Sequence, residues 1–342
     1  MALFQMGTPD IAVDVGTNNT RVYVKDKGIV VNEPSVVIVR NDNSKHIIVV
    51  GDSAEEMIGR SAGNMRIVHP LRDGVIVDYE MAQVMIHYFV SKAIGTRHFV
   101  RPRMVVTLPG EVSKVERRAV INAMERIGAR QIFVVEQSFA AALGTGLPVY
   151  EPIGSFVVDV GGGTTEVALV SMGGIVLSHS IRVAGNKIDD AISGYLKKQH
   201  GILVTDRVAE RLKLDIADVR PTENMEHIAV VRGRDIATGM PLTVDVNMSK
   251  VSEAIHDTIK EILSAIKWVL GRIPPEFAVD ILQNGIFLTG GSAALPHLDS
   301  MIASEFGVPV SVARDAGECT TLGAGYMADH FDMLGGTNKE DV

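Results

Sequence analysis

Several residue types are scarce in this 342-residue sequence, and each scarcity excludes a class of protein. Cys319 is the single cysteine, which excludes an intramolecular disulfide framework and a cysteine-rich zinc site. No run of about 18 apolar residues occurs, so no membrane-spanning helix is expected. Residues 1–10 lack the basic and apolar parts of a signal peptide. We therefore expect a protein of a reducing cytoplasm.

Positive charge is also scarce. Lysine and arginine number 33 against 41 acidic residues, which gives a net charge of −8, and no basic block occurs. Sequence-independent binding to nucleic acid is therefore not expected. Apolar residues make up 46% and aromatic residues only 5%, so the cores should consist of aliphatic side chains and methionine. The length predicts about two domains.

One pattern occurs twice in the sequence. The first copy is IAVDVGTNNTRVYV at 11–24, and the second is FVVDVGGGTTEVAL at 156–169. Each copy is an apolar strand that ends near an aspartate, a turn of small residues, a closing threonine and a second alternating strand. The aspartates are Asp14 and Asp159. The repeat predicts two related halves.

The residue types of this pattern suit a phosphate and metal site. A buried carboxylate is costly unless it is paired with a charge or a metal. Magnesium keeps most of its waters, so one or two carboxylates suffice to hold it. Glycines let backbone N–H groups approach phosphate oxygens, and threonine hydroxyls add donors. The alternative is a pair of ordinary β-hairpins with Asp and Gly as turn residues.

Strand and helix patterns alternate along the chain, which predicts an α/β architecture. Ser113 and Glu116 form a capping-box pattern for a helix that ends before Gly128. Ser249 is the predicted N-cap of a long amphipathic helix that ends before a Pro-Pro pair. The predicted strands include 30–39, 47–50, 104–108, 132–135, 175–181, 228–231 and 285–289.

A third glycine turn follows the strand predicted at 285–289. It contains Gly290, Gly291 and Ser292. Backbone without bulky side chains at a strand–helix junction permits close approach of a ribose or adenine. The alternative is a tight turn between a strand and a helix.

Five strings carry a resemblance to a known family. They are NEPSVV at 32–37, PLRDGVIVD at 70–78, ERRA at 116–119, VDVGGGTTEVA at 158–168 and LTGG at 288–291. Together they resemble the MreB family of bacterial actin-like filament proteins, within the superfamily of actin, sugar kinases and heat-shock-chaperone ATPases. The resemblance extends from about residue 10 to about residue 325.

The resemblance implies an α/β, actin-like fold of two lobes, each with a mixed five-stranded sheet, flanking helices and a smaller subdomain. Lobe I would comprise 1–145 and 313–342, with its small subdomain at about 33–66. Lobe II would comprise 146–312, with its small subdomain at about 183–247. ATP and magnesium would bind between the lobes.

The resemblance also assigns site residues. Asp14 and Asp159 would hold magnesium through water. The first phosphate loop would contain Gly16, Thr17, Asn19 and Thr20, and the second Gly161, Gly162, Gly163, Thr164 and Thr165. Glu210 and Lys213, together with the late turn Gly290, Gly291 and Ser292, would lie at the ribose and base. For Glu210 and Lys213 the alternative is an exposed ion pair one helical turn apart.

The predicted hydrolytic centre departs from the family pattern. In VEQSFAAA, Gln137 occupies the position of the usual glutamate and Ser138 that of the usual proline. Gln137 can orient the attacking water, with Thr164 assisting, but it cannot accept a proton into a carboxylate. Eukaryotic actins carry glutamine at the comparable place. Glu136 should point to the opposite face of its strand. We expect slow hydrolysis of ATP to ADP and phosphate.

The resemblance implies contact with the inner face of the cytoplasmic membrane. Phe99 and Val100 lie in the loop 95–102, flanked by basic residues that suit an anionic surface. The apolar residues 1–6 are too few for a stable isolated helix. The alternative is that Phe99 and Val100 begin a strand and pack inward.

Three functions compete at this point. The first is a polymerising ATPase that forms paired, membrane-associated filaments with itself and works with other cell-shape proteins. The second is a small-molecule kinase on the same scaffold, for which no convincing base is found. The third is a chaperone-type ATPase, for which we expect a peptide-binding domain that residues up to Val342 do not include.

Overall fold

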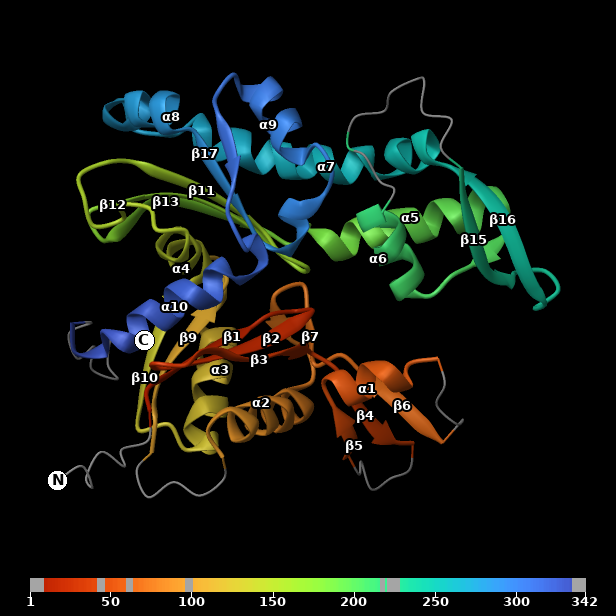
Figure 1. The fold of residues 1–342 in the computed structure, drawn as a ribbon, viewed down its shortest axis with the longest axis horizontal. Helices are drawn as coiled ribbons and strands as arrows, with labels where there is room; N and C mark the ends of the chain where they lie inside the picture. Colours follow the sequence, from red (N-terminus) through yellow and green to blue (C-terminus); the bar gives the residue numbers. More distant parts are fainter. Residues whose placement is uncertain are drawn as a thin grey trace. The chain divides into compact units, whose positions relative to one another are not determined.

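The computed structural model describes residues 9–41, 47–59, 64–95, 101–215, 219 and 228–333. The chain divides into two compact units (Figure 1). Unit 1 comprises Met1–Pro148 and Glu318–Val342, and unit 2 comprises Val149–Gly317. Phe99 and Val100, the predicted membrane residues, lie outside the described residues.

Unit 1 is built on a mixed five-stranded sheet with the strand order β10-β9-β1-β2-β3. β1 pairs antiparallel with β2 and parallel with β9. All five residues of β1 are buried, because the sheet is covered on both faces. The strands are β1 (Ile11–Val15), β2 (Asn19–Val24), β3 (Gly28–Pro34), β9 (Arg103–Leu108) and β10 (Gln131–Glu136).

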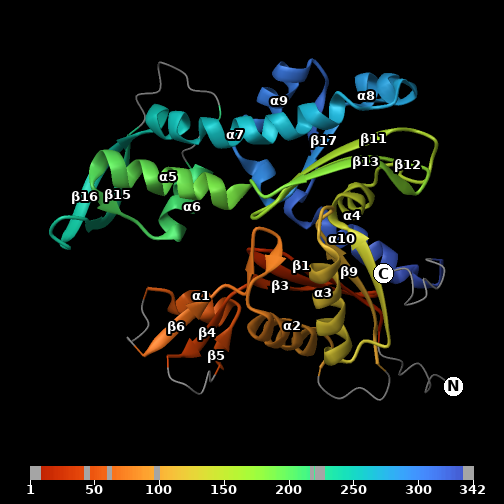
Figure 2. The ribbon, with the colours of Figure 1, turned by 180° about the vertical axis from the view of Figure 1, so that it is seen from behind.

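Helices cover both faces of this sheet. α2 (Tyr79–Ile94) and α3 (Lys114–Ile127) lie on one face, and α4 (Gln137–Gly144) and α10 (Cys319–Asp329) lie on the other (Figures 1 and 2). The predicted capping box of α3 is confirmed: Ser113 accepts a hydrogen bond from the N–H of Glu116, whose carboxylate accepts one from the N–H of Ser113. Gly128 ends this helix in a left-handed conformation.

The chain of unit 1 leaves the main sheet after β3 and forms a small three-stranded sheet. The predicted continuous strand over 30–39 is wrong, because the chain turns at Ser35 and β4 (Val37–Arg40) belongs to this second sheet. A short hairpin then leads into α2. The remaining elements are β5 (Ile47–Val50), α1 (Asp52–Met57), β6 (Met65–Val68), β7 (Leu71–Arg72) and β8 (Val75–Ile76).

The main sheet of unit 2 repeats the plan of unit 1. Its order is β13-β12-β11-β17-β18, with β11 antiparallel to β12 and parallel to β17. β11 therefore takes the place of β1, and β17 that of β9. The strands are β11 (Ser155–Val160), β12 (Thr165–Ser171), β13 (Gly174–Ile181), β17 (Ile286–Thr289) and β18 (Val310–Val312). The two mixed sheets confirm the predicted α/β class.

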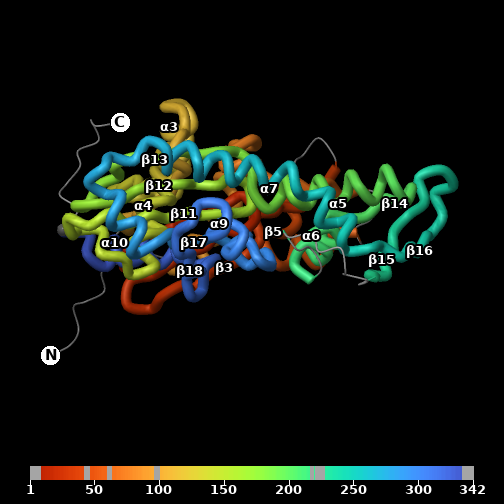
Figure 3. The backbone as a smooth tube through the Cα atoms, turned by 90° about the horizontal axis from the view of Figure 1, so that it is seen from above, coloured from red at the N-terminus to blue at the C-terminus, as the bar shows by residue number. Residues whose placement is uncertain are grey.

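Two long helices of unit 2 run side by side, and a small sheet lies at their far ends (Figures 1 and 3). They are α5 (Gly185–His200) and α7 (Met248–Leu270). The predicted N-cap Ser249 is wrong: Asn247 caps α7 and accepts a hydrogen bond from the N–H of Ser249. The small sheet contains β14 (Ile202–Leu203), β15 (Ile228–Asp235) and β16 (Pro241–Asn247).

Shorter helices complete the described chain. In unit 2 they are α6 (Asp206–Asp215), η1 (Pro275–Phe277), α8 (Ala278–Asn284), η2 (Gly291–Ala294) and α9 (Leu298–Phe306), with η3 (Ala316–Glu318) at the return to unit 1 and η4 (Phe331–Met333) after α10. Among the helices described, none is both long and apolar enough to cross a bilayer.

Candidate functional site

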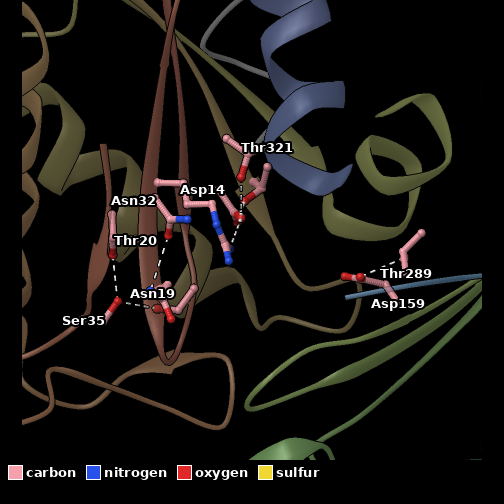
Figure 4. A network of polar contacts seen from close by, with 11 residues as sticks. Asp14, Asn19, Thr20, Asn32, Ser35, Asp159, Thr289 and Thr321 are labelled. Atoms are coloured by element: carbon pink, nitrogen blue, oxygen red, sulfur yellow. Dashed lines mark hydrogen bonds and ion pairs between the residues drawn. The ribbon is translucent and has the colours of Figure 1, made fainter. Parts of the chain in front are cut away.

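Asp14 is buried in the central strand of unit 1 and is held by two threonine hydroxyls. Thr107 Oγ1 donates to Asp14 Oδ1 at 2.6 Å, and Thr321 Oγ1 donates to Asp14 Oδ2 at 3.0 Å (Figure 4). Thr107 lies beside Asp14 in the parallel register of β9, and Thr321 belongs to α10. Arg21 adds a positive charge, with Nη1 at 3.8 Å from Oδ2. Only 4% of Asp14 is exposed, so these partners offset the cost of its burial.

Ser35 organises the turn that follows Asp14. Its hydroxyl donates to the carbonyl oxygen of Gly16 at 2.7 Å and shares a hydrogen bond of 2.8 Å with the hydroxyl of Thr20 (Figure 4). Its N–H donates to the carbonyl of Asn18 at 2.7 Å. The start of the small sheet of unit 1 is therefore tied to the turn between β1 and β2.

The two other predicted residues of this turn also have defined partners. Thr17 Oγ1 accepts a hydrogen bond of 2.9 Å from the N–H of Gly74 in the β7–β8 hairpin. The side-chain amide of Asn19 donates to Asn32 Oδ1 at 3.4 Å. Gly16 and Thr17 thus lie in one turn, and Asn19 and Thr20 begin β2 directly after it. The position of this turn is fixed by β3, Ser35 and the β7–β8 hairpin.

Asp159 has the equivalent position in unit 2. Thr289 Oγ1 donates to Asp159 Oδ1 at 2.9 Å, and Thr289 lies beside Asp159 in the parallel register of β17 (Figure 4). The cross-strand partners differ between the units. Arg21 lies opposite Asp14, whereas the buried Glu166 lies opposite Asp159 and accepts a hydrogen bond of 2.7 Å from Ser180. The two copies therefore share the aspartate–threonine pair but not the neighbouring charge.

The glycine turn of unit 2 is closed by backbone hydrogen bonds. The N–H of Gly161 donates to the carbonyl of Thr164 at 2.9 Å, and the carbonyl of Gly162 accepts from the N–H of Asn186 at 2.8 Å. Thr165 is fully buried, and its hydroxyl donates to the carbonyl of Val183 at 2.7 Å. The predicted residues Gly161 to Thr164, including Gly163, therefore form one turn against the start of α5, and Thr165 begins β12 directly after it.

The late glycine turn packs against the end of β11. Gly290 has φ of +89°, and a Cβ atom there would lie 2.2 Å from the carbonyl oxygen of Val160 and 2.8 Å from Asp159 Oδ1. Only glycine permits this approach. Ser292 is 6% exposed, and its hydroxyl donates to the carbonyl of Gly161 at 2.7 Å. The late turn and the phosphate turn of unit 2 are therefore in direct contact.

Lys213 is buried rather than exposed. Its Nζ donates to Asp189 Oδ2 at 2.9 Å and to the carbonyl of Gly185 at 3.4 Å, while Glu210 on the same helix is exposed. The alternative of an exposed ion pair between Glu210 and Lys213 is therefore wrong. Burial raises the pKa of Asp189 to about 6, although Lys213 lowers it. Lys213 thus connects α6 to the start of α5.

Gln137 is the first residue of α4, directly after β10. Burial raises the pKa of the preceding Glu136, and the positive charge of Arg117 lowers it. Arg117 belongs to α3, which lies on the face of the sheet opposite to α4. Ser138, at the position of the usual proline, is 1% exposed, and its hydroxyl has no hydrogen-bond partner among the described residues.

Sequence reasoning missed the three threonines that hold the aspartates. Thr289 ends β17 and Thr107 is the last residue but one of β9, each after an apolar run, in the strings IFLT and MVVT. A polar residue at the end of a buried strand was the available signal. Thr321 offered no comparable signal, because it reaches Asp14 from a helix 307 residues further along the chain.

The structure is similar to a crystal structure of MreB5 of Spiroplasma citri bound to AMPPNP, with a TM-score of 0.88 and 32% identity, covering 95% of this chain and 97% of that chain. It also resembles the MamK double helical filament, with a TM-score of 0.79, 23% identity and coverage of 94% and 99%, which supports the fold alone. The fold is therefore that of the actin-like proteins.

The family follows from the sequence matches. The family model described as MreB/Mbl protein matches residues 8–336. The chain is 42% identical over 325 residues to the cell shape-determining protein Mbl of Bacillus subtilis (95% of this chain, 97% of the relative). It is also 42% identical over 336 residues to the cell shape-determining protein MreB of Escherichia coli K12 (97% and 96%). The chain belongs to the MreB/Mbl family.

Proposed function

We propose that this chain binds ATP with magnesium, hydrolyses the ATP slowly and polymerises into filaments that take part in determining cell shape. The observation that carries the proposal is the duplicated aspartate hairpin: Asp14 and Asp159 are buried at equivalent strand positions, each bonded to a threonine in parallel register. Solved relatives at 32% identity are MreB5 proteins of Spiroplasma citri bound to AMPPNP and to ADP. The relatives do not favour the kinase alternative.

The aspartates suit a hydrated magnesium ion. Each carries two carboxylate oxygens, the ligand type that magnesium prefers, and contacts through water leave the threonine hydrogen bonds in place. Magnesium would neutralise charge on the phosphates. Backbone N–H groups of the turns after Asp14 and Asp159 would bind the phosphate oxygens, with Thr17 and Thr164 as further donors. Thr20 is fully buried, so its hydroxyl would support the first turn through Ser35 rather than contact the phosphates.

The base and ribose would be bound by the late turn and by α6. Gly291 is exposed, whereas Gly290 is buried against the end of β11. Glu210 could reach a ribose hydroxyl because it is exposed. Lys213 would act through its contacts with Asp189 and Gly185 rather than by reaching out to the ligand. Replacing Glu210 with Gln should weaken binding of ATP and of adenosine alike.

Gln137 would orient the water that attacks the γ-phosphate, with Thr164 assisting. Its amide oxygen accepts a hydrogen bond from water but is a poor base, so hydrolysis should be slow. Gln137→Glu should accelerate phosphate release on the order of tenfold. This is less than the ~100-fold of a well-placed general base, because Gln137 already orients water. Phosphate release would be timed on filaments, and an unchanged or lower rate would contradict this role.

Filament formation is the direct test of the function. The chain would be incubated with magnesium and ATP, then examined by sedimentation and negative-stain electron microscopy, with Asp159→Asn as the control variant. We expect nucleotide-dependent filaments from the wild type and few from the variant. A wild-type chain that stays monomeric at concentrations where its relatives assemble would refute the proposal.

We further propose that the filaments lie at the inner face of the cytoplasmic membrane, with other cell-shape proteins as partners. The basis is the sequence around Phe99 and Val100, where apolar residues are flanked by Arg97 and Arg101. Replacing both apolar residues with Ser should reduce pelleting with anionic liposomes. Undiminished pelleting would exclude this loop as the contact.

A further inference from the structure

The carbonyl oxygen of Gly161 is the point where three segments of unit 2 meet. It accepts a hydrogen bond of 2.7 Å from the hydroxyl of Ser292 in the late turn and one of 3.2 Å from the N–H of Gly185 at the start of α5. A carbonyl oxygen has two lone pairs, so both are used. The first peptide group of the phosphate turn is therefore held from two sides.

The surroundings leave little freedom to the Ser292 hydroxyl. A Cβ atom on Gly185 would lie 2.4 Å from Ser292 Oγ and 3.3 Å from the carbonyl oxygen of Gly161. The same Cβ atom would lie 3.2 Å from Lys213 Nζ. Lys213 Nζ itself donates a hydrogen bond of 3.4 Å to the carbonyl of Gly185. The hydroxyl is thus enclosed by the phosphate turn, α5 and α6, in a place where 6% of the residue is exposed.

The direction of the Gly161 carbonyl determines the direction of the next N–H. In a planar trans peptide the C=O of one residue and the N–H of the next point in opposite directions. Holding the Gly161 carbonyl therefore orients the N–H of Gly162, and the bond from Asn186 to the Gly162 carbonyl orients the N–H of Gly163 in the same way. Within the described part of the chain, neither of these N–H groups donates to another residue. Two such successive N–H groups form a site for an anion.

We propose that Ser292 is a positioning residue that fixes the phosphate turn, and so couples the late turn to the binding of phosphate. The inference rests on the proposed ATP binding and deepens it. A glycine at this position would have no hydroxyl to donate to the Gly161 carbonyl. Ser292 thus gives this chain a pre-oriented phosphate turn that a glycine cannot provide.

The test separates phosphate binding from base binding. The affinities of wild type, Ser292→Ala and Ser292→Gly for Mg-ATP and for adenosine would be measured by displacement of a fluorescent ATP analogue. The loss of one hydrogen bond corresponds to roughly a fivefold change in affinity. We expect ATP to bind about fivefold more weakly to both variants, whereas adenosine should bind as to the wild type.

A matched control is available in the same unit. Ser171 is 6% exposed, and its hydroxyl also donates to a backbone carbonyl, that of Glu151, at 3.3 Å. Ser171→Ala should leave both affinities unchanged, and thermal unfolding without nucleotide would establish that every variant is folded.

Two results would overturn the role of Ser292 without contradicting the proposed function. One is an unchanged ATP affinity in a folded Ser292→Ala variant. The other is an equal loss of affinity for ATP and adenosine, which would mean that Ser292 shapes the base site. A folded wild-type chain that binds no ATP would overturn the proposed function itself.

Discussion

The hydrogen bond between Thr107 and Asp14 gives the sharpest test of how unit 1 stabilises its buried aspartate. Thr107→Val replaces the hydroxyl with a methyl group of similar size, so packing in the sheet is preserved. Thr107 is fully buried, and its hydroxyl lies 2.6 Å from Asp14 Oδ1. Water cannot replace the lost donor there. A hydrogen bond to a charged group contributes about 1.5–3 kcal/mol, and this is the expected loss in the free energy of unfolding.

The loss should appear as a lower melting temperature without nucleotide. For a unit of this size, 1 kcal/mol shifts Tm by about 2–4 °C, so Thr107→Val should lower Tm by about 3–12 °C in calorimetry. Thr289→Val makes the equivalent change in unit 2, where Thr289 is also fully buried and bonded to Asp159 at 2.9 Å. It should have a comparable effect.

A double-mutant cycle isolates the hydrogen bond from other consequences of the substitution. In an Asp14→Ala background the acceptor is gone, so Thr107→Val should cost almost nothing or be slightly stabilising. The coupling free energy between the two positions should then be about 1.5–3 kcal/mol. A coupling near zero, or a Tm of Thr107→Val equal to that of the wild type, would refute the reasoning that Thr107 stabilises the buried carboxylate.

Further predictions concern close packing and titration. Gly323→Ala should lower Tm by several degrees, because the added Cβ would lie 1.8 Å from the carbonyl oxygen of Ala140 in α4. Gly194→Ala in α5, where nothing lies within 4 Å of the added Cβ, should instead stabilise the protein by about 1 kcal/mol. Equal effects of the two substitutions in thermal unfolding would contradict the packing argument. Burial, and then the hydrogen bond to Asp329, raise the pKa of Tyr23 to about 12. Because the folded pKa lies above the usual value of about 10, Tyr23 contributes stability that is complete below pH 10 and is lost as the pH rises through 12. An ultraviolet titration should show a tyrosine transition near pH 12 that Tyr23→Phe removes, and its persistence in the variant would exclude Tyr23 as the source.

The parts of the fold that local pattern determines were predictable. The aspartate hairpins follow from runs of apolar residues that end in a turn of small residues, and the capping box of α3 follows from Ser113 and Glu116. Local pattern failed where two options differ by a few residues. Asn247 and Ser249 are both residue types that favour an N-cap, and in the structure the cap is Asn247. The strand predicted over 30–39 ignored Pro34, directly before Ser35, although a proline argues against a continuous strand.

The partners of the site residues were less predictable, because they depend on distant segments. Lys213 lies three positions from Glu210, yet its partner Asp189 comes from another helix, and only the fold brings them together. Thr321 contacts Asp14 through the packing of α10 on the sheet of unit 1. Such contacts need the strand register and the path of the chain, and neither is encoded in a short string.

The return of α10 to unit 1 has a consequence for the order of events during translation. Domains generally fold as they emerge from the ribosome, N-terminal first. Here unit 1 is interrupted: its sheet is made first, but the helix that supplies Thr321 emerges only after all of unit 2. Unit 2 is continuous in sequence, so its core can form before α10, the last helix of unit 1, has been synthesised. The nascent chain therefore holds Asp14 without its full set of donors until unit 2 has been synthesised, which delays the completion of unit 1.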